Sequence, residues 1–522
     1  MFGVAGNIVR TPTDLPSQER SPMSRIMALA RLAAGAIILI TPGLSAFANT
    51  GDGPGWNKPL SVTEPNGIQS VEGQCVHQPG QQGVDACTSI IQSGVPEEEL
   101  GWAYFDRALH FTQLANYSAA VSDFTKGLSI NPKDADALYW RAAANYQLGD
   151  AVDTISDTNA AIQLDPKRAD FFILRGKALR SLELYDQAIK NFDQSLVLDE
   201  HSNVALRERG IARYGKGDYV AAKADFDTAL SIAPSITAYE FRGNTYYKLA
   251  EFELAIQDYN RALKLDPSYM FAISRRAAAE IQLKNYQAAA DDLTKYLTED
   301  PQSSTSLVNR GIVFKRLNKL DAALHDLNAA VKIAPQDSIA LAERGDVLEK
   351  MGNSAQALAD LNASLALKSD DPYSLQTRAG VFTAIGKFDS AFQDYDRIVQ
   401  LRPNDPAALN NRCWSRAIWN VKVNLALDDC TKSLTLRPNS AFTLGSRSFA
   451  DYRLGQFQAA VADSTAALAI DPQSADAFYI RGLAKQRLDD TSSANDISSA
   501  LAIRPTIAKE YGSYGIAAPQ ER

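Results

Sequence analysis

The sequence has few of the residues on which catalytic and metal sites depend. Its 522 residues include four histidines and four cysteines, and no two cysteines form a CxxC pair. Metal ligands, or a nucleophile and its base, must converge in space, whereas the histidines are far apart in the chain. No glycine-rich phosphate loop is present. We therefore expect no enzymatic activity, no metal and no cofactor. The four histidines are His77, His110, His201 and His325.

Basic residues are outnumbered by acidic ones. Lys and Arg number 53 against 61 Asp and Glu, which gives a net charge of −8. No basic block supplies the footprint of a nucleic-acid-binding protein, so nucleic acid is not an expected partner. With 45% hydrophobic and 22% charged residues, the composition is that of an ordinary folded protein rather than a disordered one.

Long apolar runs are missing apart from one short stretch, Leu32–Ile40. Arg25 and Arg31 precede it, Pro42-Gly43 ends it, and Ala46-Phe47-Ala48 fits a signal-peptidase site. We predict a secretory signal region over residues 1–48, with Met23 as an alternative start, followed by a flexible linker over 49–74. The expected location is the bacterial periplasm. The alternative is an inner-membrane anchor formed by residues 32–48, the one expected route to membrane contact.

The cysteines occur as two near pairs, Cys75 with Cys87 and Cys413 with Cys430. An even number in near pairs within an exported protein predicts two local disulfides. The alternative is four buried thiols, since free cysteine packs as a small apolar residue.

An arginine recurs through the chain at nearly constant spacing. Nine of the eleven gaps are 34 residues, and the others are 33 and 35. A fixed period in this range is typical of a stacked-repeat protein. The series is Arg107, Arg141, Arg175, Arg209, Arg242, Arg276, Arg310, Arg344, Arg378, Arg412, Arg447 and Arg481.

Each period reads as two helices. In the clearest unit, two helix-length stretches, 135–148 and 151–164, flank the turn Gly149-Asp150, and Pro166 closes the unit. Small residues follow the arginine, as in Arg175-Gly176, and recur about 13 residues later, as at Ala188. Small side chains at both places allow two helices to approach closely.

Small residue, helix, small residue, helix and proline at a 34-residue period resemble the tetratricopeptide repeat (TPR), and the Arg-Gly variety is nearest. The resemblance implies an all-α, right-handed superhelical solenoid of about twelve hairpins over residues 101–505. Residues 75–100 are expected to form an N-terminal capping half-repeat, and 506–522 a C-terminal cap or tail.

An acidic residue recurs with the same period as the arginines. Eleven of the twelve are followed after 15 to 17 residues by an aspartate, and Asn191 is the exception. We predict an Arg–Asp ion-pair ladder, within or between hairpins. The alternative is a basic stripe that binds an anionic ligand. The clearest ladder pairs are Arg141 with Asp157, Arg242 with Asp258, Arg310 with Asp326, and Arg344 with Asp360.

The resemblance implies that first helices line a concave groove in which a protein or peptide segment binds. Residues that share the helical face next to each arginine are the groove candidates. They are Trp102, Phe105, Lys177, Arg180, Arg207, Tyr214, Asn244, Tyr247, Lys248, Lys315, Arg316 and Tyr452. This locally basic and aromatic set suits an acidic or mixed extended peptide.

The function predicted from the sequence is therefore a non-enzymatic protein-binding scaffold of the bacterial cell envelope. The alternative is a structural or accessory subunit of an envelope secretion or polysaccharide-export assembly.

Overall fold

The structure, a computed structural model, describes residues 71–516. Every regular element in that range is helical, with 27 α-helices, one short 3-10 helix and no strand. The predicted signal region and most of the predicted linker lie outside the described residues. The first described helix begins at Val71, so residues 71–74 are helical rather than linker.

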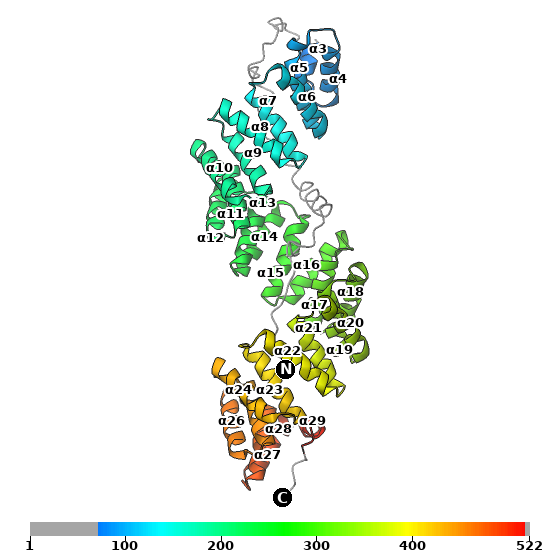
Figure 1. The fold of residues 1–522 in the computed structure, drawn as a ribbon, viewed down its shortest axis with the longest axis vertical. Coiled ribbons are helices and arrows are strands. Elements are labelled where there is room, and N and C mark those ends of the chain that lie inside the picture. Colours follow the sequence, from blue (N-terminus) through cyan, green and yellow to red (C-terminus); the bar gives the residue numbers. More distant parts are fainter. Residues whose placement is uncertain (1–70, 517–522) are drawn as a thin grey trace. The chain divides into compact units, whose positions relative to one another are not determined.

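The helices follow one another as antiparallel hairpins, each with a first and a second helix (Figure 1). The N-terminal pair is α3 (Val71–His77) and α4 (Gln81–Ile91), followed by the 3-10 helix η1 (Glu97–Glu99). Hairpins one to five are α5 (Gly101–Gln113) and α6 (Tyr117–Ile130), α7 (Ala135–Gln147) and α8 (Ala151–Leu164), α9 (Ala169–Ser181) and α10 (Tyr185–Leu198), α11 (Asn203–Lys216) and α12 (Tyr219–Ile232), α13 (Ile236–Lys248) and α14 (Phe252–Leu265). The sixth repeat of the sequence supplies α15 (Met270–Gln282) and α16 (Tyr286–Glu299).

Hairpins seven to twelve complete the repeat. They are α17 (Ser304–Arg316) and α18 (Leu320–Ile333), α19 (Ser338–Lys350) and α20 (Ser354–Leu367), α21 (Pro372–Ala384) and α22 (Phe388–Leu401), α23 (Pro406–Trp419) and α24 (Val423–Leu436), α25 (Ala441–Arg453) and α26 (Phe457–Ile470), α27 (Ala475–Arg487) and α28 (Ser493–Ile503). A last short helix, α29 (Ile507–Ser513), follows the twelfth hairpin.

In the second hairpin, local sequence fixes where the helices begin and where the turn between them lies. In the second hairpin, the Asp134 carboxylate accepts a hydrogen bond from the Ala137 amide and so caps α7. Gly149 then takes a positive φ of 83°, a conformation that favours glycine. Asp150 caps α8 by accepting from the amides of Val152 and Asp153.

The chain forms two compact units. Within the described residues, the N-terminal unit contains 71–283 and the C-terminal unit 284–516, so α15 and α16 belong to different units. In both units, successive first helices contact one another, as α7 does α9 and α17 does α19. No successive second helices of the described residues make comparable contact. First helices therefore lie on the inner side of the stack in each unit.

Candidate functional site

The repeated arginines are held within their own hairpins. In ten hairpins the arginine Nε and Nη2 donate to the carboxylate of the aspartate on the second helix, at 2.6–3.2 Å. In the third hairpin Arg175 donates to the Asn191 amide oxygen at 2.7 Å. The paired aspartates are Asp123, Asp157, Asp225, Asp258, Asp326, Asp360, Asp394, Asp429, Asp463 and Asp496.

The same arginines also reach back to the preceding hairpin. Arg344 Nη1 donates to Asn328 on α18 at 3.1 Å, and Arg209 Nη1 to Asp193 on α10 at 2.7 Å. Each acceptor stands two residues after the aspartate of its own hairpin, or after Asn191 in the third. These acceptors are Thr125, Asn159, Asp193, Asp227, Asn260, Thr294, Asn328, Asn362, Asp396 and Thr465.

This second contact was not predicted, although its signal is periodic. The sequence repeats Asp, any residue, then Thr, Asn or Asp, as in Asp326-Leu327-Asn328. Arg107 makes the same backward contact with Thr88 of α4, so the N-terminal pair of helices joins the series. Ten of the twelve arginines thus bond both within their own hairpin and to the preceding one, and their donors are used by the protein rather than offered to a ligand.

A close helix contact lies beside each ion pair. A methyl group on Gly210 would lie 2.7 Å from the Phe226 ring, and one on Gly311 would lie 2.8 Å from Leu327. In the tenth hairpin the equivalent residues are Cys413 and Cys430, which form a disulfide. Cys75 and Cys87 form a second disulfide between α3 and α4. Since Thr88 accepts the backward bond of Arg107 and directly follows Cys87, Cys87 has the same position on its second helix as Cys430.

Three basic side chains gather around one carboxylate on α9 and α11. Arg180 donates to Glu208 at 3.0 Å, and Arg207 contacts the same carboxylate at 3.3 Å. The Lys177 ammonium lies 4.7 Å from the centre of the Tyr146 ring. These residues, Lys177, Arg180, Arg207, Glu208 and Tyr146, are called the basic cluster below. Three cations share one carboxylate.

The pKa shifts in the basic cluster reflect this excess of three positive charges over one negative charge. Burial would raise the pKa of Glu208, but Arg180, Lys177 and Arg207 together hold it below its ordinary value. Burial lowers the pKa of Lys177; Glu208 opposes this shift, but Arg180 and Arg207 lower the pKa further, so the net shift is downward. Among the described residues, the buried Nε atoms of Arg180 and Arg207 have no hydrogen-bond partner. An added anionic group would relieve the repulsion among the three cations.

Two other predicted groove residues are already engaged by neighbouring helices. Asn244 is buried and accepts a hydrogen bond from Tyr259 at 2.9 Å. The Lys315 side chain is only 5% exposed, since its ammonium pairs with Glu343 and with Asp346 at 2.6 Å. Burial lowers the Lys315 pKa, but the two carboxylates raise it above its ordinary value. Neither side chain is available to a ligand.

The other predicted groove residues differ in solvent exposure. Trp102 and Phe105 are buried between helices and so do not line an open surface. Tyr214 packs against Phe241, Tyr247 against Phe252, and Tyr452 against Phe457, each half-buried. Lys248 and Arg316 are exposed.

The described residues contain no cluster of His, Cys, Asp and Glu suited to a metal ion.

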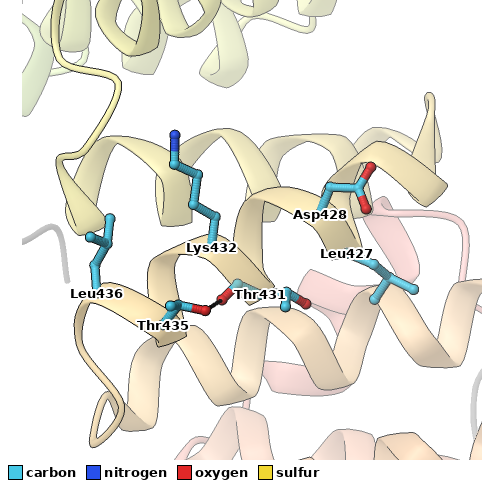
Figure 2. A pocket seen from close by; sticks show the side chains of 6 residues that line it. All are labelled: Leu427, Asp428, Thr431, Lys432, Thr435 and Leu436. Carbon is cyan, nitrogen blue, oxygen red and sulfur yellow. Dashed lines mark hydrogen bonds between the residues drawn. The ribbon is translucent and has the colours of Figure 1, made fainter.

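A hollow of about 440 Å³ runs along α24 (Figure 2). Its lining residues Leu427, Asp428, Thr431, Lys432, Thr435 and Leu436 all come from this one helix. Because no second element brings polar groups to it, we assign it no ligand. Within residues 71–516, no helix combines the length and apolarity needed to cross a membrane.

Stacked helical hairpins with a 34-residue period define an α-helical repeat protein. Family models described as tetratricopeptide repeat match residues 236–269 and residues 105–169, 173–235, 308–372 and 345–406. The chain belongs to the TPR family. Proteins of this family generally act as non-enzymatic scaffolds that bind protein or peptide partners.

Individual relatives are distant. Sperm-associated antigen 1 of Mus musculus is 36% identical over 80 residues, which span 15% of this chain and 9% of that protein. Among solved structures, YrrB, described as a TPR protein with an unusual peptide-binding site, is 23% identical, with a TM-score of 0.33, and covers 35% of this chain and 95% of its own. Yeast Tom70 is 14% identical, with a TM-score of 0.37, and covers 80% of this chain and 95% of its own.

Proposed function

We propose that this protein is a non-enzymatic scaffold that binds an acidic segment of a partner protein on the first-helix surface of its N-terminal unit. The observation that carries the proposal is the basic cluster, where three cations share Glu208 within a chain of net charge −8. A carboxylate side chain of the partner would take the place of the missing negative charges.

The rest of that surface supports an extended partner. Tyr146 supplies an aromatic ring beside Lys177, and Tyr214 and Tyr247 are half-buried on the next two first helices. Half-buried aromatic side chains gain binding energy from apolar contact at low entropic cost. Charged and aromatic groups on successive first helices suit a peptide that runs across the hairpins.

For the location, we propose export to the periplasm after cleavage near Ala48, or anchoring by residues 32–48. The support is the signal-like sequence together with two disulfides, since disulfides persist in oxidising compartments.

The experiment is cross-linking capture from cells that produce the protein, with three forms of the full chain. The wild type is compared with Lys177→Ala/Arg180→Ala/Arg207→Ala and with a control, Lys167→Ala/Lys190→Ala/Lys264→Ala. The control removes the same charge from exposed positions outside the first helices. We expect a partner captured by the wild type and control but lost from the cluster variant. Equal capture by all three forms would contradict the proposal.

A second candidate is a permanent subunit of an envelope assembly for secretion or polysaccharide export. The observation that favours it is the recurring arginine bond to the preceding hairpin, found in both units, since a stiff stack suits a structural role. Co-purification with other components in a fixed ratio, resistant to high salt, would support this function over transient peptide binding.

A further inference from the structure

The C-terminal unit contains a segment that lies across its first helices in the way a bound peptide would. After the twelfth hairpin, residues 507–516 form α29 and a short extension. α29 contacts α27 and α28, and the extension reaches α25 and α23. The segment therefore crosses three successive first helices. We call residues 507–516 the tail segment.

Aromatic side chains anchor the tail segment. The Tyr511 ring lies 4.9 Å from the Tyr479 ring and 5.2 Å from the Phe449 ring, between centroids. Its hydroxyl donates to Asp476 at 3.0 Å. Farther along, the Tyr514 ring meets the Trp414 ring edge-on at 6.4 Å, although the two residues are 100 positions apart in the chain.

A polar contact fixes the backbone of the tail segment. Arg453 on α25 donates to the carbonyl oxygen of Tyr514. The same guanidinium donates to the carbonyls of Ala417 and Ile418 at the end of α23, both at 3.0 Å. Arg453 thus connects the backbone of the tail segment to α25 and α23. Because the acceptor is a backbone carbonyl, this contact does not depend on which side chain the bound segment has at that position.

Ordinary packing of one more hairpin does not account for these contacts. A further first helix would lie against α28 and α27, whereas Tyr514 and Arg453 connect the tail segment to hairpins ten and eleven. Ile516 is also buried at the far end of the segment. The tail segment therefore fills the inner surface over hairpins ten to twelve.

We propose that this inner surface, formed by Trp414, Phe449, Arg453 and Tyr479, is a second peptide-binding site, for aromatic segments with the spacing of Tyr511 and Tyr514. In the resting chain the tail segment occupies it. A partner segment of the same chemistry binds when the tail segment leaves. This site is separate from the basic cluster, which lies in the other unit and selects acidic groups, so either proposal can fail alone.

The test uses a fluorescein-labelled peptide with the sequence of residues 504–516 and the full-length chain, followed by fluorescence anisotropy. The wild type should bind weakly, because its own tail segment competes. Tyr514→Ala/Ile516→Ala should bind at least about tenfold more tightly, because the half-buried Tyr514 and the buried Ile516 no longer anchor the competing tail segment. Adding Arg453→Ala should weaken the binding again. Ile503→Ala, an exposed apolar residue on α28, is the matched control and should behave as wild type.

Hydrogen exchange of the unmodified wild type gives an independent readout. The amides of residues 507–516 should exchange faster than those of α27 and α28, through local release of the tail segment. Two results would overturn the proposal. One is a folded Tyr514→Ala/Ile516→Ala chain that binds the peptide no better than wild type. The other is exchange of the tail segment only together with unfolding of α27 and α28, which would make it a permanent part of the last hairpin.

Discussion

Arg344 grips Asp360 at two points, with its Nε and Nη2 at 2.6 and 2.7 Å from the two carboxylate oxygens. Its remaining nitrogen bonds Asn328 of the preceding hairpin. This one side chain closes its own hairpin and joins it to the one before. Because the arrangement recurs along both units, the arginines form the frame of the stack, and partner choice is left to residues that do not repeat.

The ion pairs should contribute strongly to stability because they are largely buried. Asp326 is 2% exposed and Arg310 is 18% exposed. Removing one member leaves an unpaired buried charge, so Asp326→Ala should lower the free energy of unfolding by about 3–5 kcal/mol. Denaturant unfolding measures the change, with exposed Asp321→Ala as the control. A loss below about 1 kcal/mol would show that the pair behaves as a surface pair.

The third hairpin offers the opposite experiment. Arg175 faces Asn191 where the other described pairs have aspartate, and burial lowers the Arg175 pKa. Asn191→Asp should restore the charge-assisted bond and raise the free energy of unfolding by about 0.5–1 kcal/mol at low salt. Unfolding of this variant in parallel with wild type checks the gain, which added salt should reduce. A variant less stable than wild type at every salt concentration would refute the expected benefit.

The tenth hairpin uses a disulfide where others use close packing. Cys413→Ala/Cys430→Ala should lower stability by about 3 kcal/mol, since the disulfide closes a short loop of the unfolded chain. Cys413→Ala/Cys430→Phe reproduces the Ala108 and Phe124 arrangement of the first hairpin and should recover part of the loss. Thermal unfolding of all three forms tests this. Identical unfolding of wild type with and without reductant would contradict a stabilising disulfide.

Asp451 should make stability depend on pH. Burial, together with the nearby charge of Asp463, raises its pKa to about 7, while Arg447 acts in the opposite direction. Its ordinary value is 3.8, so the folded state binds the proton more tightly than the unfolded state. The resulting stabilisation is complete below pH 3.8 and is lost as pH rises toward 7. Asp451→Asn should therefore be more stable than wild type at pH 8, with the difference shrinking toward pH 4. Unfolding curves across this range measure it, and a constant difference would contradict the assignment.

The frame could be predicted from the sequence because its residues recur in phase. Arg310 and Asp326 stand at the same positions as their counterparts in other hairpins, so the pattern identifies both partners without knowledge of the fold. The backward bond from Arg344 to Asn328 was missed, although the acceptor is equally periodic. Its type varies among Thr, Asn and Asp, which hides the position in a search for identical residues.

The surfaces could be predicted only in part, because a helical face does not show what the next helix supplies. Lys315 has the expected position on α17, yet Glu343 and Asp346 on α19 neutralise it. Arg180 has the equivalent position on α9, five residues after its repeated arginine, but α11 supplies only Glu208 for Arg180, Lys177 and Arg207. The contact between Trp414 and Tyr514 joins positions 100 residues apart, and no period of the sequence relates them.

Site-specific photo-cross-linking in cells that produce the protein tests the proposed binding surface most directly. A photoreactive phenylalanine derivative replaces Tyr146, beside Lys177 in the basic cluster, or Val197, which is 77% exposed on the second helix α10. We predict a discrete partner adduct from position 146 and none from position 197, with the adduct at 146 lost in Lys177→Ala/Arg180→Ala/Arg207→Ala. Adducts from position 197 without any from position 146 would contradict binding on the first-helix surface.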